Sequence, residues 1–400
     1  MSTLNKKRRI AVVIVDRANY GRLRPVMRII KEHPDLELIT ICTGTMVLER
    51  FGNAVDVVRE DGFEVESEIH IAVEGSTPET TAKTLGFSII EFTTAFQRTR
   101  PDIVLIIGDR SESLGAMLAA SYQNFCIVHI QGGEVSSSSD EMARHVMTKL
   151  SNYHFPATKR SAMYLEMMGE DPETIFPYGC PVADEISNTD LHVNPDVVNG
   201  AGIGGPIDIT KDYFLAIYHP LTTQYYSKKE QVGELLSALQ DIRMPTLWLW
   251  ANIDPGADCI NKAVRMHREY IDNSWLQVVK NFKPEHYQML LANARVAIGN
   301  SSSFVRDASL LGTPVVLLGE RQKGRETAEN VLNCSEIKKD KIIKLINQQL
   351  THGRYVPSNL YGEPGVSEKI VNTLAKIKIY NQKHLHYVKE QSSVYVSNSE

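Results

Sequence analysis

The apolar residues of this chain fall in short runs rich in valine and isoleucine, with stretches of helical periodicity between them. Strands of a parallel sheet have this pattern when helices cover both faces, because neither side of such a strand meets water. The pattern predicts strands at Ile10–Val15, Leu36–Ile41, Ile103–Ile107 and Cys126–Ile130, and then at Tyr213–Tyr218, Thr246–Trp250, Val296–Ile298 and Pro314–Leu318. We therefore expect an α/β fold of parallel strands and crossover helices.

Most of these predicted strands end in polar or glycine-containing pairs. Open α/β sheets bind ligands at the carboxyl ends of their strands, so these endings are the first candidates for a functional site. They are Asp16-Arg17, Gly108-Asp109-Arg110, His219-Pro220, Ala251-Asn252 and Gly299-Asn300.

Length and composition predict two domains followed by a helical extension. At 400 residues the chain exceeds the size at which a single core keeps growing. Residues 188–210 are rich in Asn, Asp, Gly and Pro, which is typical of a linker. We expect domains at 1–190 and 211–367. Residues 368–400 then hold an amphipathic helix, Glu368–Asn381, that packs back on the first domain, and a polar tail.

Charge and cysteine content exclude several classes of function. A net charge of −5 with scattered basic residues argues against nucleic acid as a partner. Five distant cysteines without a CxxC pair predict neither a disulfide framework nor a zinc site, so no metal or cofactor is expected. The basic start leads into an apolar run without a cleavage site, and no run approaches the roughly 18 apolar residues of a membrane span. We expect a cytoplasmic protein without membrane contact.

The segment Gly299–Phe304, GNSSSF, joins a predicted strand to a predicted helix. Serine hydroxyls and unpaired backbone N–H groups at a helix N-terminus make a cradle for phosphate, although a serine N-cap alone is the more common use of this pattern. Three consecutive serines favour anion binding. Arg321 and Arg325 follow the next strand, where they add guanidinium groups to the same phosphate or form a solvated surface run.

The acid and base candidates are less specific. His219 follows a strand, where its imidazole can donate a proton or form a hydrogen bond to a phosphate. A structural role is the alternative for a single histidine. Asp16-Arg17 and Asp109-Arg110 predict a charged cleft, although each pair alone is consistent with a salt bridge. On a predicted helix, Asp140 shares a face with Arg144, and Glu141 shares one with His145. An ordinary ion pair is the simpler interpretation of that spacing.

A longer ordered set of motifs resembles the hydrolysing UDP-N-acetylglucosamine 2-epimerases of sialic-acid-type pathways. The resemblance runs from about residue 9 to about residue 380, with motif order and spacing kept. It rests on VDRANYGRLRPVM, TGTMVLERFG, GDRSE, HIQGGE, DEMARHVMTKLSNYHF, YGCPVAD, YHP, GNSSSFVRDASLLGTPVV and GERQKGRE.

This resemblance implies a GT-B architecture of two Rossmann-like domains with the active site between them. It implies a UDP-sugar as partner, held mainly by the second domain, and a homodimer or homotetramer. The reaction it implies eliminates UDP across C1 and C2 to give a glycal, adds water, and releases an N-acetylmannosamine-type sugar. Such chemistry needs a base for the C2 proton and cations for the departing diphosphate.

The resemblance also assigns roles to single positions. The implied nucleotide contacts are Arg17, Arg110, His219, Asn252, Ser301, Ser302, Asp307 and Arg321. The implied catalytic and sugar-site residues are Asp109, Asp140 and Arg144, with Glu134 and Glu141 beside them. His219 is also implied as catalytic, because it assists the departure of UDP. Gln131 stands where relatives carry a catalytic Glu or a His.

Several positions depart from the pattern of that family. Met46 replaces a His, Ser111 an aromatic residue, and Phe304 a small residue after the serines. We expect the larger side chain of Phe304 to crowd the phosphate loop. Gln131 cannot exchange a proton near neutral pH, so Asp109, Asp140 or another group must do so. Because these changes fall mainly on the sugar side, the sequence indicates a nucleotide sugar more firmly than N-acetylglucosamine, and a 2,4-diacetamido sugar also fits.

Three other functions stay open at this point. A non-hydrolysing epimerase would return a 2-epimeric UDP-sugar. A GT-B glycosyltransferase would need an acceptor and would not exchange the C2 proton. A non-catalytic nucleotide-sugar binding protein is suggested by Gln131 and Met46.

Overall fold

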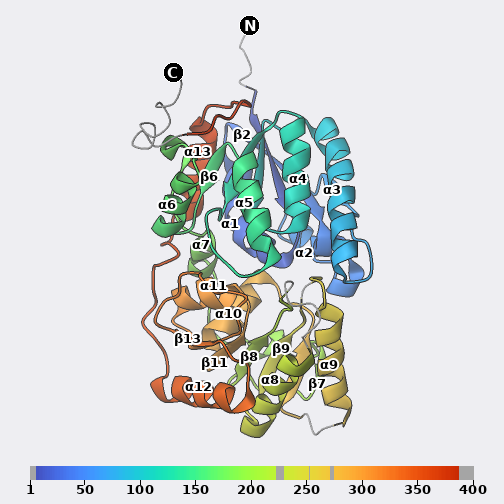
Figure 1. Cartoon of the computed structure of the whole chain (residues 1–400), viewed down its shortest axis with the longest axis vertical. Helices are drawn as coiled ribbons and strands as arrows, with labels where there is room; N and C mark the ends of the chain where they lie inside the picture. Colours follow the sequence, from blue (N-terminus) through green and yellow to red (C-terminus); the bar gives the residue numbers. More distant parts are fainter. Residues whose placement is uncertain (1–5, 222–228, 252, 271–273, 387–400) are drawn as a thin grey trace, which may run out of the picture.

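The computed structural model describes residues 6–221, 229–251, 253–270 and 274–386. Figure 1 shows two lobes, one above the other, each built on its own sheet with helices on both faces. Every strand predicted from the apolar runs is present, within two residues of its expected bounds. The prediction of an α/β fold with two Rossmann-like domains is confirmed.

The first sheet is entirely parallel, in the order β3-β2-β1-β4-β5-β6. Alternate residues of β1 enter two different cores: Ile10 and Val12 pack toward one face, Ala11 and Val13 toward the other. Both faces are therefore apolar, as the continuous valine and isoleucine runs require. The strands are β1 (Arg8–Ile14), β2 (Leu36–Thr43), β3 (Ser67–Ile69), β4 (Ile103–Ile107), β5 (Cys126–Ile130) and β6 (Tyr153–Phe155).

Helices cover this sheet on both sides. The core on one face includes residues of α1 (Arg17–Glu32), α2 (Val55–Glu60) and α13 (Val366–Lys376). The core on the other face includes residues of α3 (Pro78–Thr99), α4 (Ser111–Tyr122) and α5 (Ser139–Leu150). Two further helices, α6 (Lys159–Met167) and α7 (Val182–Ser187), follow along the chain.

The second sheet has the order β13-β12-β11-β8-β9-β10-β7 and is parallel except for β7. One face packs on α8 (Lys229–Ile242), α9 (Ala257–Tyr270) and α12 (Lys339–His352), and the other on α10 (Pro284–Asn293) and α11 (Ser303–Leu311). The strands are β7 (Ile203–Gly204), β8 (Phe214–Ile217), β9 (Thr246–Leu249), β10 (Leu276–Val279), β11 (Val296–Gly299), β12 (Val315–Leu318) and β13 (Val331–Cys334).

The segment predicted to be a linker holds more structure than expected, and a strand that the apolar runs did not predict follows Leu318. Within 188–210, β7 pairs antiparallel with β10, and after Leu318 the chain adds β13 to the edge of the sheet. Both strands lie at sheet edges and have exposed positions, so the continuous apolar run that marks a buried strand is missing from their sequences.

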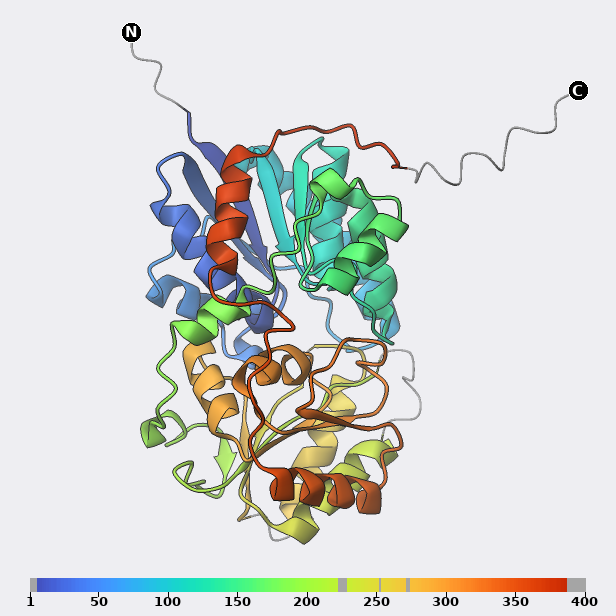
Figure 2. The same cartoon turned by 90° about the vertical axis from the view of Figure 1, so that its left-hand side faces the viewer.

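The helix α13 ends at Lys376, earlier than the predicted Asn381. Beyond it, the chain bonds to the first domain instead of to its own preceding turn. Tyr380 donates to the Asn152 carbonyl at 2.8 Å, and Lys383 Nζ donates to the Ser151 carbonyl at 2.6 Å. Figure 2 shows α13 beside α1 in the upper lobe, although the chain reaches it from the lower lobe.

Each sheet has one point where the strand order reverses. In the first sheet, β1 and β4 are neighbours, and Asp16 and Asp109 follow them. In the second sheet, β8 and β11 are neighbours, and His219 and Ser301 follow them. Crevices form where successive crossovers leave in opposite directions, so these reversals are where a ligand is expected.

Candidate active site

One cleft collects residues from both domains. Its lining includes the ends of β1 and β4 from the first sheet and the ends of β8 and β11 from the second. Of the residues predicted from the sequence, it is lined by Arg17, Asp109, Arg110, Gln131, Asp140, Arg144, His219, Ser301, Ser302, Asp307 and Arg321. Glu134 and Glu141 stand beside the lining, and Asn252 lies outside the described residues.

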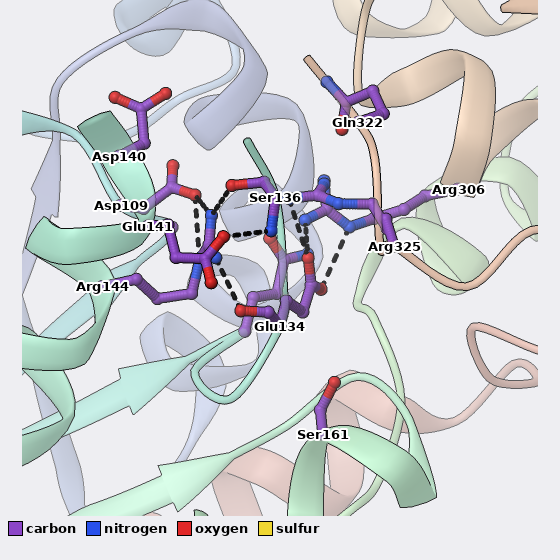
Figure 3. A network of polar contacts seen from close by, with 12 residues as sticks. Asp109, Glu134, Ser136, Asp140, Glu141, Arg144, Ser161, Arg306, Gln322 and Arg325 are labelled. Carbon is purple, nitrogen blue, oxygen red and sulfur yellow. Dashed lines mark hydrogen bonds and ion pairs between the residues drawn. The ribbon is translucent and has the colours of Figure 1, made fainter. Parts of the chain in front are cut away.

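Asp109 and Arg144 form a close ion pair at the first-domain side of the cleft (Figure 3). Arg144 Nε donates to Asp109 Oδ2 at 3.1 Å, and its Nη1 donates to the Glu134 carbonyl at 2.6 Å. Burial acts to raise the pKa of Asp109, but the guanidinium groups of Arg144 and Arg325 outweigh it and hold that pKa well below its usual range. Asp109 is therefore ionised near neutral pH.

Arg144 does not pair with Asp140, although the two are four residues apart on α5. The ion pair considered from that spacing is absent, because the tertiary fold brings Asp109 to the same guanidinium. The second spacing is realised: His145 Nε2 lies 3.4 Å from Glu141 Oε1. Glu141 also accepts a hydrogen bond from the Ser136 backbone N–H at 2.7 Å.

Asp140 is the carboxyl group best suited to exchange a proton. It accepts from Ser138 Oγ at 2.9 Å, and Arg321 Nη2 is 3.9 Å away. Burial and the nearby charges of Asp109 and Asp254 raise the pKa of Asp140 to about 6. Two neighbouring carboxyl groups whose pKa values are pushed apart are typical of acid and base pairs in active sites.

Glu134 reaches across to the second domain (Figure 3). It pairs with Arg306 of α11, which donates from both Nε and Nη2, and lies 3.2 Å from Arg325 Nη2. Burial opposes ionisation, but these guanidinium groups lower the pKa of Glu134 to about 2. Its geometry is that of a buried charge pair between domains.

Gln131 is clamped by two neighbours. Arg22 Nη1 donates to its Oε1 at 3.1 Å, and its Nε2 contacts Cys180 Sγ at 2.9 Å. The backbone of Gln131 is in the left-handed region, with φ at 69°, which residues other than glycine seldom adopt. Gln131 is thus a fixed polar wall of the cleft.

The serine segment lies at the N-terminus of α11, as predicted. Ser302 is the N-cap residue but makes no side-chain capping bond, and Ser301 Oγ lies 2.8 Å from Ser303 Oγ. Gly299 brings the loop close to β8: at its φ of 144°, a Cβ would lie 1.8 Å from the Ile217 carbonyl oxygen. Ser301, Ser302 and Ser303 line the cleft, so their hydroxyls form a candidate anion cradle at the helix N-terminus.

Arginine and histidine side chains surround this cradle. Arg321 Nη1 donates to the Asn300 carbonyl at 3.3 Å, and Asn300 in turn holds the backbone of His219. Burial, together with the charge of Arg321, lowers the pKa of His219 to about 3, so its imidazole is neutral at pH 7. It is suited to a neutral hydrogen bond rather than to charge pairing.

The remaining nucleotide candidates also have defined partners. Arg17 Nη1 donates to the Lys280 carbonyl at 2.6 Å, which ties α1 to the second domain. Asp307 accepts from Gln288 Nε2 at 2.9 Å, and burial raises its pKa. Its other oxygen, Oδ1, and Gln288 Oε1 have no hydrogen-bond partner among the described residues, so both can accept from a ligand hydroxyl.

Two of the departures from the family pattern are explained by packing. Phe304 is fully buried among the apolar residues of the second domain, so the expectation that it crowds the phosphate loop is wrong. Met46 is also fully buried, in the core of the first domain. Ser111 begins α4 and donates to Glu112 Oε2 at 3.0 Å.

Sequence reasoning missed two arginines that line the cleft, Arg22 and Arg306, whereas the predicted Arg325 lines it as well. Arg325 Nε and Nη1 are buried without a hydrogen-bond partner among the described residues, which suits an anionic ligand. The signal for Arg22 and Arg306 was weak because each sits inside a helical pattern, where an arginine usually faces solvent. Only the folded chain brings them to one cleft.

The chain is similar to known proteins along most of its length. The family model for UDP-N-acetylglucosamine 2-epimerase matches residues 28–375. A UDP-N,N'-diacetylbacillosamine 2-epimerase (hydrolyzing) of Legionella pneumophila is 34% identical over 94% of this chain and 97% of that relative. A UDP-N-acetylglucosamine 2-epimerase of Neisseria meningitidis is 27% identical over 87% of this chain and 89% of that relative.

Solved structures show the same fold. The UDP-GlcNAc 2-epimerase of Methanocaldococcus jannaschii, in complex with UDP-GlcNAc and UDP, superposes with a TM-score of 0.76 at 17% identity, covering 92% of this chain and 99% of that one. The UDP-GlcNAc 2-epimerase of Neisseria meningitidis bound to UDP-GlcNAc gives 0.75 at 18%, covering 92% and 100%. The chain belongs to the UDP-N-acetylglucosamine 2-epimerase family.

Proposed function

We propose that this protein is a hydrolysing 2-epimerase that converts a UDP-acetamido sugar and water into UDP and the free 2-epimeric sugar. The observation that carries the proposal is a carboxyl group with a pKa of about 6, Asp140, in a cleft lined by arginines from both domains. Proton exchange near neutral pH and stabilisation of a leaving diphosphate are the two requirements of the elimination. The hydrolysing relatives support the same reaction.

In the first step, Asp140 takes the C2 proton while the C1–O bond to UDP breaks, which leaves a double bond between C1 and C2. Arg321, the serine cradle and the neutral imidazole of His219 stabilise the departing diphosphate. Asp109 stays ionised beside Arg144 and orients that guanidinium toward the sugar.

In the second step, water adds across the same double bond. Ser138 relays the proton from Asp140 to C2 on the face opposite to the one from which it was removed, so that Asp140 is a carboxylate again. The oxygen of water bonds to C1, and the second proton of that water passes to the diphosphate of UDP. Gln131 holds no exchangeable proton and serves as a hydrogen-bonding wall. UDP then leaves as a separate product.

For the substrate, we propose a UDP-2,4-diacetamido sugar rather than UDP-N-acetylglucosamine. The 34% identical relative is a UDP-N,N'-diacetylbacillosamine 2-epimerase, whereas the UDP-N-acetylglucosamine enzymes match at 27% or less. A second acetamido group brings an N–H donor and a carbonyl acceptor. The amide of Gln131 has one lone pair and one N–H beyond those engaged by Arg22 and Cys180, and these match the two groups.

Incubation with each donor in deuterated water tests the reaction and the substrate together. The expected products are free UDP and a C2-deuterated sugar, with higher kcat/KM for the diacetamido donor. A deuterated UDP-sugar would instead indicate the non-hydrolysing epimerase. UDP release only with an acceptor and without deuterium would indicate a glycosyltransferase, and UDP binding without turnover of any donor would indicate a binding protein.

We further propose a cytoplasmic homodimer. The five cysteines are unpaired, as expected in a reducing compartment. No helix in the described part of the chain is long and apolar enough to cross a membrane.

Phe87 and Ile90 on α3 and Met142 and Val146 on α5 are exposed, on helices that flank α4 in Figure 1. Sedimentation should give a dimer, and Phe87→Glu with Ile90→Glu a monomer; an unchanged mass would exclude this face.

A further inference from the structure

Two arginines from different domains share one carboxylate behind the cleft. Arg110, at the start of α4, donates from Nη1 to Asp254 Oδ1 at 2.7 Å. Arg321, which follows β12, has its Nη2 at 3.7 Å from Asp254 Oδ2. Both arginines line the cleft, whereas Asp254 stands behind them, between β9 and α9, with its side chain 8% exposed.

Neither arginine depends on Asp254 alone for its position. Glu112 holds Arg110 with both of its oxygens at 3.2 Å, and Asp16 lies 3.9 Å away. Arg321 is also bonded to the Asn300 carbonyl. The main contribution of Asp254 to the cleft is therefore a buried negative charge close to both guanidinium groups.

We propose that Asp254 is a counter-charge shared by Arg110 and Arg321 that limits how tightly the site holds the diphosphate of UDP and so keeps product release fast. It is a positioning residue that acts through the two arginines and does not touch the substrate. The proposal rests on the proposed function, in which Arg321 binds the diphosphate, and extends that role to Arg110, which lines the same cleft.

The physical reason is the sum of charges that the diphosphate meets. A carboxylate behind two guanidinium groups partly cancels their attraction for an anion in front of them, and in a buried site such a charge is poorly screened. An effect on the order of tenfold in affinity is expected from this partial cancellation. Weaker binding favours fast release, which matters because UDP leaves after every turnover.

A second readout comes from Asp140. The charged groups that face it are Asp109, Asp254, Arg321 and Arg110, of which the two carboxylates oppose its ionisation. If the charge of Asp254 is removed, Asp140 ionises more easily, and the acid limb of the kcat/KM profile moves to lower pH. A purely structural role of Asp254 would not move this limb in that direction.

The test compares Asp254→Asn, which keeps the acceptor for Arg110 without the charge, with Asp254→Glu, which keeps the charge. Asp258→Asn, an exposed carboxylate in the first turn of α9, is the matched control. Titration calorimetry with UDP alone should show about tenfold tighter binding for Asp254→Asn and little change for the other two. Product inhibition by UDP should strengthen in the same ratio.

Unchanged or weaker UDP binding by a folded Asp254→Asn protein would overturn the proposal. If that variant does not fold, Asp254→Ser removes the same charge and carries the same expectation. Wild-type protein that binds no UDP would instead contradict the proposed function. UDP binding that is strong in the wild type and insensitive to the charge at residue 254 would contradict this inference alone.

Discussion

At the scale of single residues, Asp109 and Asp140 have the same chemistry but opposite environments. Asp109 is ion-paired with Arg144. Asp140 is partly buried near the carboxylates of Asp109 and Asp254, and the guanidinium of Arg321 is as far as 3.9 Å from it. Their pKa values therefore move apart, and only Asp140 changes charge near neutral pH. One environment makes a fixed anion and the other a proton carrier.

If Asp140 is the base, it works in its ionised form, so kcat/KM should rise with pH and level off above a midpoint near pH 6. Asp140→Asn should lower kcat by about 100-fold or more while UDP affinity stays within a few-fold. Steady-state rates from pH 5 to 8 check both. Asp340→Asn, an exposed carboxylate on α12, is the control. A normal rate for Asp140→Asn would show that another residue is the base.

At the scale of elements, the N-terminus of α11 has a serine at the N-cap position that does not cap the helix. A serine N-cap normally accepts a bond from the first turn, but Ser302 makes no such bond. By contrast, Thr77 at the start of α3 accepts from the Thr80 N–H at 3.2 Å. The hydroxyl of Ser302 is therefore available to a ligand.

We expect Ser302→Ala to weaken UDP binding by about tenfold, because a hydrogen bond to a charged group contributes about 1.5–3 kcal/mol. The melting temperature without ligand should change little. Thr77→Ala should do the reverse, with a loss of about 1 kcal/mol of stability and normal UDP binding. Calorimetry and thermal unfolding measure the two effects, and a large stability loss in Ser302→Ala would favour plain capping.

At the scale of the whole molecule, buried charges join the domains. Glu134 from the first domain meets Arg306 and Arg325 from the second, and Arg24 of α1 pairs with Glu285 at the start of α10. The sequence interpretation placed Glu134 beside the catalytic residues, and its contacts give it a second role in holding the cleft together.

Glu134→Gln should destabilise the protein by about 3–5 kcal/mol, because two buried guanidinium groups lose their counter-charge. The pKa of Glu134 is lowered to about 2, below its value of about 4.3 in an unfolded chain. Its stabilisation is therefore complete above the unfolded pKa and is lost as pH falls toward 2. Urea unfolding at pH 7 and pH 3 should show a smaller difference from wild type at pH 3.

The exposed pair Glu320–Lys323 on the second domain provides the control for this prediction. Glu320→Gln should change stability by no more than about 0.5 kcal/mol, because water screens an exposed ion pair. If Glu134→Gln were as mild, the charge cluster would contribute little to holding the domains together.

The sequence by itself determined the buried strands, the residues at their carboxyl ends and the family. A strand covered on both faces needs a continuous apolar run, and strand ends need polar residues, so both leave local signals. Asp109, His219 and Ser301 were found in this way, and all three line the cleft. Edge strands such as β7 and β13 left no such signal.

The tertiary structure alone decided which charges meet. Arg144 pairs with Asp109 rather than with its helical neighbour Asp140, and Arg110 meets Asp254 across the domain boundary. An ion pair depends on distance in space and on burial, which spacing along the chain does not encode. The pKa of Asp140 therefore could not be read from the sequence: it is set by which neutral and charged groups the two folded domains bring around it.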